Sequence, residues 1–378
     1  MIGLSVSAGP PAVAGPVTPR SVVLSDWMGQ MSAQLADVPL DRIAMPGSHD
    51  ATSWDINPTT GVCPSGDEAG VSSDFPTVAS SMSITQSGSI VDQLNGGSRY
   101  LDLRLCDVNG VWYGYHGGPL GAQPFFDTGG AAGQADQIGA WIRSHPKEVV
   151  VISVSVSSSS ANPDADEAQA LSDMAQAIGG TTMAHIATEP QLTPDSTYGD
   201  FMNAGKNAVL IDANGNTPQP WAWPAAVSQD RGSYSYAQPT WTQYLGAILT
   251  GSGLQQITQT TLNSCTTALQ QNPAAYPDSF FTLSTITDPT LTIPDAVFAQ
   301  IEAVLGLVPA GMATHYLLYE EDILNGQLLQ QFRSAWGTAP LAADVNVVTL
   351  DDVNQNQATM PAGTLERTII ALNTPGNR

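Results

Sequence analysis

The sequence predicts an α/β fold in which strands and helices alternate to form a distorted or incomplete barrel. Apolar runs of strand length alternate with longer amphipathic stretches. The run Val149-Val-Val-Ile152 is rich in β-branched residues, which is typical of a parallel strand covered on both faces. No change of composition marks a linker inside residues 22–375, and barrels of more than about 250 residues are common. We therefore expect one large α/β domain.

Six apolar runs are the strand candidates of this fold: 42–46, 100–106, 149–156, 208–211, 280–284 and 345–350. Six segments have helical periodicity, several of them opening with Asp, Ser or Pro as caps: 24–35, 134–144, 164–178, 294–305, 321–336 and 363–372. Six strands are fewer than the eight of a regular barrel, and much of 198–274 has no assignable pattern. The barrel is therefore expected to be distorted or incomplete.

The start of the chain differs from the rest in composition. Residues 1–19 are rich in Ala, Gly, Val and Pro, but lack the basic and long apolar regions of a signal peptide. We expect residues 1–21 to be a disordered leader or the remnant of a trimmed signal, and residues 22–378 to form the single domain. No run approaches the roughly 20 apolar residues that a transmembrane helix needs. Low lysine content, abundant small polar residues and net acidity favour a secreted, extracellular protein.

The charge of the chain limits its partners. The formal net charge is −23 and the two lysines are Lys147 and Lys206, so nucleic acid is not expected as a partner. Repulsion also opposes binding to anionic lipid, but salt screens it beyond about 8 Å, so a bilayer substrate stays open. Cys63, Cys106 and Cys265 show no C-x-x-C spacing, which argues against a zinc or thioredoxin-type site. One disulfide and one free thiol remain open.

Two of the five histidines stand out because each follows a predicted apolar stretch in a glycine-flanked segment. His49 lies in Met45-Pro-Gly-Ser-His-Asp50, and His116 lies in Tyr113-Gly-Tyr-His-Gly-Gly118. Loops after the carboxyl ends of parallel strands form one face, so both imidazoles are expected in one pocket. Taken singly, each is more simply a turn or surface residue. The other histidines are expected to be structural or exposed: His145, His185 and His315.

Charged residues near predicted strand ends strengthen the functional interpretation of these histidines. Asp50 directly follows His49, and Asp102 and Arg104 lie two residues apart, on one face of a strand. A buried arginine needs an anionic partner, and its planar guanidinium suits either a carboxylate or two phosphate oxygens. Asp351 follows the last predicted strand, where it is placed to orient a histidine. Alone, it would be taken as the cap of the next turn.

These segments resemble the X domain of bacterial phosphatidylinositol-specific phospholipases C. Met45–Asp50 looks like the family's motif Pro-Gly, Ser or Thr, His, then Asp or Asn. Gln93–Arg104 resembles its second motif, and Tyr115–Gly117 its third, in the expected order. The segment His145–Ile152 is similar to the family's Asn-Pro-x-Glu strand entry, and Asp351 falls where the last strand of the family carries a carboxylate. The resemblance covers about residues 38–156, and residues 157–344 have no alignment.

The resemblance implies a distorted TIM barrel and a phospholipase C-like phosphodiesterase. In this family the inositol 2-hydroxyl attacks its own phosphodiester, giving a cyclic inositol phosphate and releasing diacylglycerol. By analogy His49 is the general base, oriented by Asp351, and His116, supported by Asp50, is the general acid. Arg104 would neutralise charge on the phosphoryl oxygens. The family's calcium-dependent branch has a further carboxylate where Arg104 stands, so we expect no metal and no other cofactor.

Two positions depart from the family pattern. Ser155 stands where the secreted bacterial enzymes have a lysine, and Asp212 stands where a basic residue ends the next strand; both are candidate substrate contacts. These changes leave the identity of the head group open, whereas the residues expected to carry the phosphodiester chemistry are intact. The expected partner is a phospholipid at a membrane or micelle surface, contacted peripherally by a monomer.

Two other functions remain open from the sequence. A glycerophosphodiesterase, or a sphingolipid phosphodiesterase of the sphingomyelinase D type, has a related barrel and a histidine pair. It also needs a metal-binding carboxylate cluster, which is not found around His49 and Arg104. The other alternative is a non-catalytic barrel that binds a sugar or phosphate. The intact set of site candidates argues against it: His49, Asp50, Arg104, His116 and Asp351.

Overall fold

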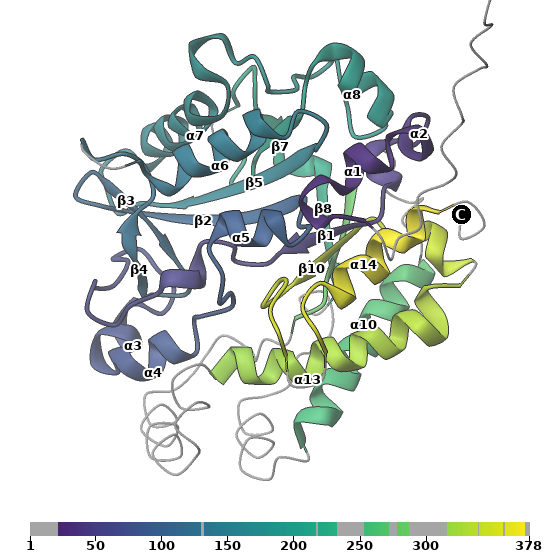
Figure 1. The fold of residues 1–378 in the computed structure, drawn as a ribbon. Helices are drawn as coiled ribbons and strands as arrows, with labels where there is room; N and C mark the ends of the chain where they lie inside the picture. The colour runs from purple at the N-terminus through teal and green to yellow at the C-terminus, as the bar shows by residue number, and fades with distance from the viewer. Residues whose placement is uncertain are drawn as a thin grey trace, which may run out of the picture.

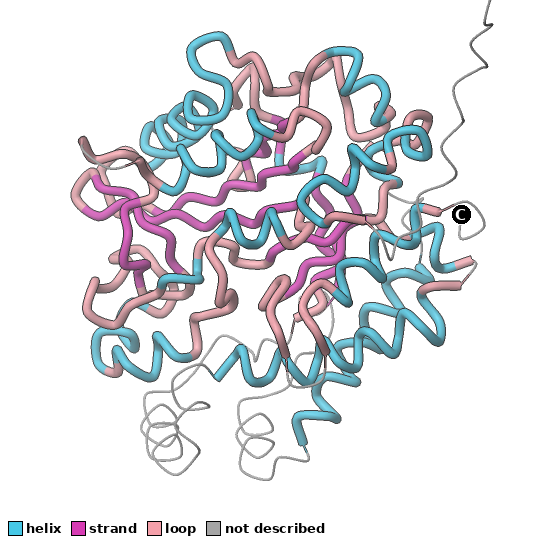
Figure 2. Tube along the Cα trace, in the orientation of Figure 1, coloured by secondary structure: helices cyan, strands magenta, loops and turns pink. Residues whose placement is uncertain are grey.

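A curled sheet with helices on its outer side makes up the described part of the molecule (Figures 1 and 2). The computed structural model describes residues 22–129, 132–216, 218–232, 253–271, 278–286, 316–338, 340–357 and 360–374. The leader expected at 1–21, the helix expected at 294–305 and His315 lie outside these residues.

Eight parallel strands of the described residues follow one another around the sheet in chain order: β1 (Met45–Ser48), β2 (Tyr100–Val108), β5 (Val150–Ser157), β6 (Ala208–Asp212), β7 (Trp223–Pro224), β8 (Ser228–Gly232), β9 (Phe280–Ser284) and β10 (Val347–Leu350). The last strand pairs with the first, so the sheet curls into a barrel. β7 and β8 are its two edges; they pair with β6 and β9, and a short turn, η6 (Ala225–Val227), connects them. The predicted α/β barrel, open at one seam, is confirmed.

All six predicted strands are present, with small shifts of their ends. β1 begins at Met45, not at residue 42, because the preceding residues form the 3₁₀ helix η3 (Leu40–Arg42). β7 and β8 fall in the stretch that had no assignable pattern. β7 has two residues and β8 is the polar run Ser-Gln-Asp-Arg-Gly, so neither offers the apolar run that predicts a strand.

An antiparallel hairpin extends the sheet from the end of β2. It consists of β3 (Val111–Tyr115) and β4 (Leu120–Pro124). β3 runs back along β2 with Gly114 opposite Leu105, so its last residue, Tyr115, returns to the level of Arg104 and His116 follows directly. The sequence placed His116 at the carboxyl end of a parallel strand. The hairpin, and not a parallel strand, brings it to the active face.

Helices cover the outer face of the sheet (Figure 1). The upper part of Figure 1 holds α6 (Gln134–Ser144), α7 (Pro163–Gly179) and α8 (Tyr198–Ala204). The other side holds α10 (Gly253–Gln271), α13 (Tyr316–Gln331) and α14 (Thr364–Ile370). Short turns complete these elements: η5 (Gly180–Thr182), η9 (Phe332–Trp336), η10 (Leu341–Asp344) and η11 (Ala371–Asn373).

Two segments differ from the helices and loops that the sequence predicts. The helix expected at 24–35 is broken into η2 (Leu24–Asp26), α1 (Trp27–Gln30) and α2 (Ser32–Leu35), because Met31 leaves the helical conformation. The loop expected between His49 and Gln93 contains η4 (Ser53–Asp55), α3 (Ala69–Asp74), α4 (Pro76–Ser81) and the start of α5 (Ile90–Asn95). These helices are short and rich in Ser, Thr and Gly, so they lack the long apolar stripe that identifies a helix.

Alternation along the strands separates an outer core from the barrel interior. On β2, Leu101, Leu103 and Leu105 face outward into the core that α6 and α7 share. The inward side chains near the amino ends of the strands are apolar or aromatic: Met45, Tyr100, Val151, Val209, Phe280 and Val347. Those nearer the carboxyl ends are polar: Asp102, Arg104, Ser153, Ser155, Thr282, Ser284 and Thr349. The barrel is thus packed with apolar side chains at one end and polar at the other.

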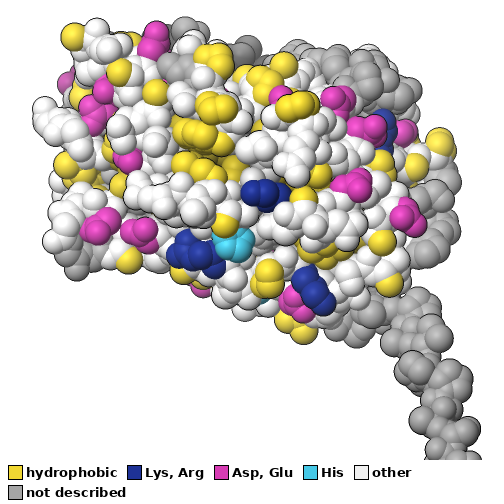
Figure 3. Space-filling view, turned by 90° about the horizontal axis from the view of Figure 1, so that it is seen from above, with side chains coloured by type: hydrophobic (Ala, Val, Ile, Leu, Met, Phe, Trp, Pro, Cys, Tyr) yellow, Lys and Arg dark blue, Asp and Glu magenta, His cyan; other side chains and the backbone are white. Residues whose placement is uncertain are grey.

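The surface reflects the acidic composition. On the face that Figure 3 shows, acidic side chains are scattered and basic side chains are few. Among the described residues, one large apolar side chain is strongly exposed, that of Val23 at 56%. Within the described ranges, no helix combines the length and apolarity needed to span a bilayer. Peripheral contact with lipid therefore stays a prediction.

One disulfide links the segment after η4 to the end of β2. Cys63 and Cys106 are bonded, with Cα atoms 5.9 Å apart, and both are buried. Cys265 is a buried thiol. The sequence left the disulfide pairing open, and the structure shows one bridge, between Cys63 and Cys106. Cys106 lies two residues after Arg104 on β2.

Candidate active site

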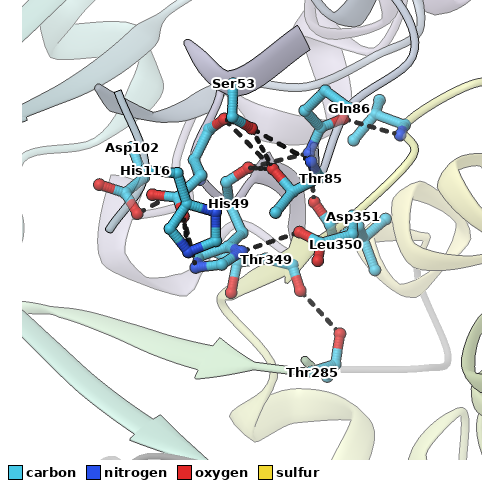
Figure 4. Close-up of polar contacts among 12 residues, drawn as sticks. His49, Ser53, Thr85, Gln86, Asp102, His116, Thr285, Thr349, Leu350 and Asp351 are labelled. Carbon is cyan, nitrogen blue, oxygen red and sulfur yellow. Dashed lines mark hydrogen bonds and ion pairs between the residues drawn. The ribbon is translucent and has the colours of Figure 1, made fainter. Parts of the chain in front are cut away.

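His49 and Asp351 follow two strands that pair side by side. Ser48 lies opposite Leu350 in the parallel register, so the next residue of each strand enters the mouth of the barrel at the same level. His49 Nδ1 lies 2.8 Å from Asp351 Oδ1, and the His49 backbone N–H donates to the Leu350 carbonyl at 3.1 Å (Figure 4). Strand register therefore builds the His49–Asp351 pair that the sequence suggested.

His116 faces His49 across the site, with ring centroids 6.1 Å apart and planes nearly perpendicular. His116 Nε2 lies 3.2 Å from Asp50 Oδ2, and its Nδ1 lies 3.0 Å from the carbonyl oxygen of Ser83. Asp50 has a φ of +41°, a left-handed conformation that turns the chain sharply after β1 and places its carboxylate between the two rings. Because both nitrogens of His116 face acceptors, a doubly protonated ring has a partner for each N–H.

Arg104 joins this group from β2. Its Nε contacts the Asp50 carboxylate, and its Nη2 lies 3.0 Å from Asp102 Oδ2 and 3.1 Å from His49 Nε2. Asp102 and Arg104 share one face of the strand, as their spacing predicted. The Arg104 side chain is 27% exposed, so its guanidinium is within reach of a ligand.

Burial and charge act on these groups in opposite directions. Burial disfavours the His49 cation, but Asp50 and Asp351 outweigh it and raise the pKa of His49 to about 9, against an opposing effect of Arg104. Arg104 and the two histidines overcome burial and hold the pKa of Asp50 below its ordinary value. Burial raises the pKa of Asp351, although His49 opposes it. The contact with Arg104, which only donates hydrogen bonds, instead requires an unprotonated His49 Nε2.

One group in the described part of the chain is compact enough to suggest a metal ion. Ligand atoms of His49, Asp50 and Asp102 lie within 4.8 Å of one another. The guanidinium of Arg104 contacts both carboxylates of this group. A cation therefore already bridges the oxygens that a metal would use, and metal independence stays a prediction.

A cavity of about 280 Å³ opens beside these residues inside the barrel. His49, Asp102 and Arg104 line one part of it. Most of the other lining side chains are hydroxyls: Tyr100, Ser153, Ser155, Ser228, Thr282, Ser284 and Thr349. Ile211, Ala213 and Ala225 complete the wall. Apart from His49, Asp102 and Arg104, the cavity thus offers neutral hydrogen-bonding partners.

The two predicted substrate contacts differ in position. Ser155 faces inward and lines the cavity. Asp212 is 2% exposed and faces outward, because its neighbour Ile211 faces inward. Asp212 accepts a hydrogen bond from the Gly215 backbone N–H at 2.9 Å, and its contact with Glu167 adds to the effect of burial in raising the pKa of Glu167. The structure therefore does not place Asp212 in the site.

A segment between α4 and α5 that was not predicted from the sequence contacts both histidines. Gln86 Nε2 donates to the His49 carbonyl at 2.9 Å (Figure 4). The Ser83 carbonyl accepts from His116. These contacts use main-chain carbonyls and one amide in a polar segment. No periodicity or motif marks residues of this kind.

The two other described histidines lie away from the cavity, as predicted. The His145 ring stacks on Trp141, with centroids 4.0 Å apart. His185 Nδ1 lies 2.9 Å from Asn207 Oδ1.

Comparison with known sequences finds relatives for about a third of the chain. No protein-family model matches it. PI-PLC X domain-containing protein 1 of Mus musculus is 30% identical over 142 residues, which are 34% of this chain and 38% of that protein. Protein 1 of Danio rerio is 31% identical over 140 residues, 34% of this chain and 43% of that protein. PI-PLC X domain-containing protein 3 of Homo sapiens is 32% identical over 139 residues, which are 34% of this chain and 41% of that protein. The chain thus spans about two fifths of the length of the curated relatives it matches.

Comparison with solved structures extends the likeness to nearly the whole chain. A mutant of the phosphatidylinositol-specific phospholipase C of Staphylococcus aureus has a TM-score of 0.55 and 12% identity, over 95% of this chain and 99% of that one. The phosphatidylinositol-specific phospholipase C of Listeria monocytogenes has a TM-score of 0.51 and 15% identity, over 93% and 100%. At such identities the likeness establishes the fold. Sequence and fold together identify the chain as a relative of the PI-PLC X-domain family, as its motifs predicted.

Proposed function

We propose that the chain is a metal-independent phosphodiesterase that cleaves an inositol phospholipid, releasing diacylglycerol and a cyclic inositol phosphate. The observation that carries this proposal is the meeting of two imidazoles and one guanidinium around the Asp50 carboxylate, beside a cavity that His49 and Arg104 line. The fold and the names of the relatives support this class of phosphodiesterase. The roles of the individual residues rest on the geometry.

In the proposed step, His49 takes the proton of the inositol 2-hydroxyl. The Nδ1 atom of His49 is bound to Asp351, so the proton goes to Nε2. His49 lines the cavity in which the hydroxyl would lie. The contact of Arg104 with Nε2 belongs to the unprotonated form of the ring, in which Nε2 carries the lone pair that a base needs. When a phosphodiester binds, we expect Arg104 to turn to the phosphoryl oxygens and leave Nε2 to the hydroxyl. A positioned base of this kind typically contributes about 10²- to 10⁴-fold in rate.

His116 supplies the proton that the leaving group needs. The 2-hydroxyl oxygen forms a bond to phosphorus, the bond from phosphorus to the diacylglycerol oxygen breaks, and that oxygen takes a proton from His116. The Asp50 carboxylate and the Ser83 carbonyl stabilise the charged ring before the transfer. Arg104 meanwhile neutralises the charge that grows on the phosphoryl oxygens.

The cavity lining favours an uncharged polyol as the head group. Its hydroxyl side chains can donate to and accept from ring hydroxyls. A head group with further phosphates would bring several negative charges into the cavity. Among the described lining residues, Arg104 is the one arginine or lysine that could neutralise them. We therefore propose unphosphorylated phosphatidylinositol as the substrate.

We also propose that the protein is secreted and acts as a monomer on lipid surfaces. The Cys63–Cys106 disulfide supports an extracellular location, since such bonds persist in oxidising compartments. The acidic charge supports the expectation that nucleic acid is not a partner.

Phosphorus NMR of purified protein with phosphatidylinositol micelles in excess EDTA tests the proposed reaction. We expect a cyclic-phosphate resonance from the wild type and none from His49→Ala. Phosphatidylinositol bisphosphate in the same micelles should remain intact.

Three outcomes would change the proposal. Product that forms after calcium is added, and not before, would contradict metal independence. Product from glycerophosphodiesters or sphingomyelin alone would favour the related phosphodiesterases. Binding of inositol phosphate without turnover of any of these lipids would favour the non-catalytic barrel.

A further inference from the structure

Gln86 is a fully buried amide that joins the ends of β1 and β10. Its Nε2 donates to the carbonyls of His49 and Leu350, both at 2.9 Å, and its Oε1 accepts from the Val353 backbone N–H at 3.1 Å. The pairing of the two strands ends at Ser48 and Leu350, directly before His49 and Asp351. Gln86 thus continues the connection between the strands at the level of the proposed base (Figure 4).

The neighbours of Gln86 extend this connection to the rest of the site. The Thr85 carbonyl accepts from the Asp352 backbone N–H at 2.8 Å. The Ser83 carbonyl accepts from His116 Nδ1 at 3.0 Å. Residues 83–86 therefore touch the backbone beside both members of the His49–Asp351 pair, and the ring of the proposed acid.

We propose that Gln86 is a positioning residue, which sets the separation of His49 and Asp351 and thereby prepares His49 to act as a base. This inference rests on the proposed function. Of the atoms that Gln86 holds, one carbonyl belongs to His49 itself and the others to the residues flanking the Asp351 turn. Without the amide, these backbone groups lose their common partner. A hydrogen bond weakens steeply once its donor and acceptor separate or tilt, so the 2.8 Å contact depends on this backbone.

The opposite end of β10 offers a matched control. Asn346 is 2% exposed, and its Nδ2 donates to the carbonyls of Leu40 and Ile43 at 3.2 and 2.8 Å. Its Oδ1 accepts from the Phe281 backbone N–H at 3.2 Å. Asn346 thus makes the same set of hydrogen bonds as Gln86, two donated and one accepted, but far from the histidines. Gln86→Met and Asn346→Leu each remove that set while keeping the size of the side chain.

The test is an NMR titration of the His49 ring in the full chain without substrate, with the signal assigned by its absence from His49→Asn. The charged groups facing this ring are Asp50, Asp351, Arg104 and His116. In Gln86→Met we expect the titration midpoint to fall by about one pH unit or more, because the carboxylate that favours the cation moves away. In Asn346→Leu the midpoint should stay that of the wild type, although both variants lose stability in urea.

Kinetics with phosphatidylinositol micelles give a second readout. At a pH above the His49 midpoint of both proteins, we expect kcat of Gln86→Met to fall about 10- to 100-fold, because the base is misplaced. KM should change little, because the head-group wall is untouched. Asn346→Leu should keep the wild-type kcat. If Gln86→Met does not fold, Gln86→Asn, which keeps an amide on a shorter side chain, should show a smaller shift in the same direction.

A Gln86 variant that is less stable but titrates and turns over like the wild type would overturn the inference and leave Gln86 a structural residue. The same shift in Asn346→Leu would overturn it too, because the effect would then follow from lost stability. If the wild type cleaves no phosphatidylinositol, the proposed function fails. The titration, which needs no substrate, still decides whether Gln86 sets the His49–Asp351 pair.

Discussion

The two ends of the barrel both hold buried charges, but they partner them differently. At the amino end, Arg99 Nε and Nη2 lie 2.8 and 2.6 Å from one oxygen of Glu148, and neither side chain is exposed. The other donated hydrogen bonds of Arg99 go to the carbonyls of Leu94, Ser98 and Leu24. Glu148 accepts in addition from the backbone N–H groups of Met28 and Gly29. One cation meets one anion, and each is enclosed by further hydrogen bonds.

At the carboxyl end the charges do not balance in this way. Three carboxylates and one guanidinium meet here, with Asp50 and Asp102 on Arg104 and Asp351 on His49, so the carboxylates outnumber the guanidinium by two. One oxygen of Asp50 is shared between His116 and His49, at 3.2 and 3.4 Å. Closed pairs hold a structure in place, whereas shared acceptors let a proton move between partners. The difference separates an end that stabilises the barrel from an end suited to acid–base chemistry.

The sharpest test of this difference is to remove the arginine at the amino end. Arg99→Met leaves the Glu148 carboxylate buried without its cation, so the free energy of unfolding should fall by about 3–5 kcal/mol. Urea denaturation measures it. Arg99→Met combined with Glu148→Gln should recover part of the loss. A loss below about 1 kcal/mol would show that the enclosing backbone contacts, and not the ion pair, hold this end together.

Removing the arginine at the carboxyl end should have the opposite consequence. Arg104→Met takes away the cation proposed to meet the phosphoryl oxygens, so turnover should fall about 10²- to 10³-fold. The free energy of unfolding should change by no more than about 1 kcal/mol, because the side chain is partly exposed and Asp50 keeps both histidines as partners. A variant that unfolds like Arg99→Met would erase the distinction between the two ends. Lipid turnover and urea denaturation on the same preparation decide it.

The pH dependence of activity and of stability should run in opposite directions at the carboxyl end. The pKa of His49 is raised from 6.5 to about 9, so its stabilising effect is complete below pH 6.5 and is lost as pH rises through 9. A base must be unprotonated, so kcat/KM for a phenol ester, whose leaving group needs no acid, should rise about 50-fold from pH 7 to pH 9.

Stability curves in urea for the wild type and His49→Asn isolate the contribution of the ring, which is expected to reach about 3 kcal/mol. An activity that is already level at pH 7 would mean that the contact with Arg104 keeps His49 neutral. In that case the two carboxylates would not control its protonation.

The disulfide offers a test of the acid apart from the base. The Cys63 backbone N–H donates to the Gly118 carbonyl at 2.7 Å, and Cys106 lies two residues after Arg104. The bridge thus holds the turn that carries His116 against β2. In Cys63→Ser combined with Cys106→Ser, turnover of a lipid should fall about tenfold, because an alkoxide leaves slowly without an acid.

An inositol phosphate ester of a phenol provides the matched control for this variant, since a phenolate leaves without an acid. Its turnover should be unchanged when the bridge is removed. Equal losses on both substrates would mean that the bridge supports the site as a whole and not His116 in particular.

The sequence predicted the barrel and much of the site because both depend on strand pattern. His49, Asp50 and Asp351 follow apolar runs directly, and Arg104 lies on one face with Asp102, so alternation and strand ends are enough to bring them together. His116 was expected in the same pocket as His49. An unassigned antiparallel hairpin brings its ring to face that of His49, but the residues that line the cavity do not include it. Gln86 could not be found in this way, because its role depends on the backbone geometry of two strands distant in sequence.

Ser155 and Asp212 give the smallest effect and the strictest test of alternation as a guide. They lie on neighbouring strands, Ser155 on the inner face and Asp212 on the outer, so one residue of register decides which of them meets a ligand. Ser155→Ala should raise KM for phosphatidylinositol about two- to threefold, the effect of losing one hydrogen bond to a neutral hydroxyl. Asp212→Asn should leave KM unchanged, because its side chain meets Glu167 and Gly215 outside the barrel. A rise in KM for Asp212→Asn alone would place the head group on the other side of the sheet and would require a different site.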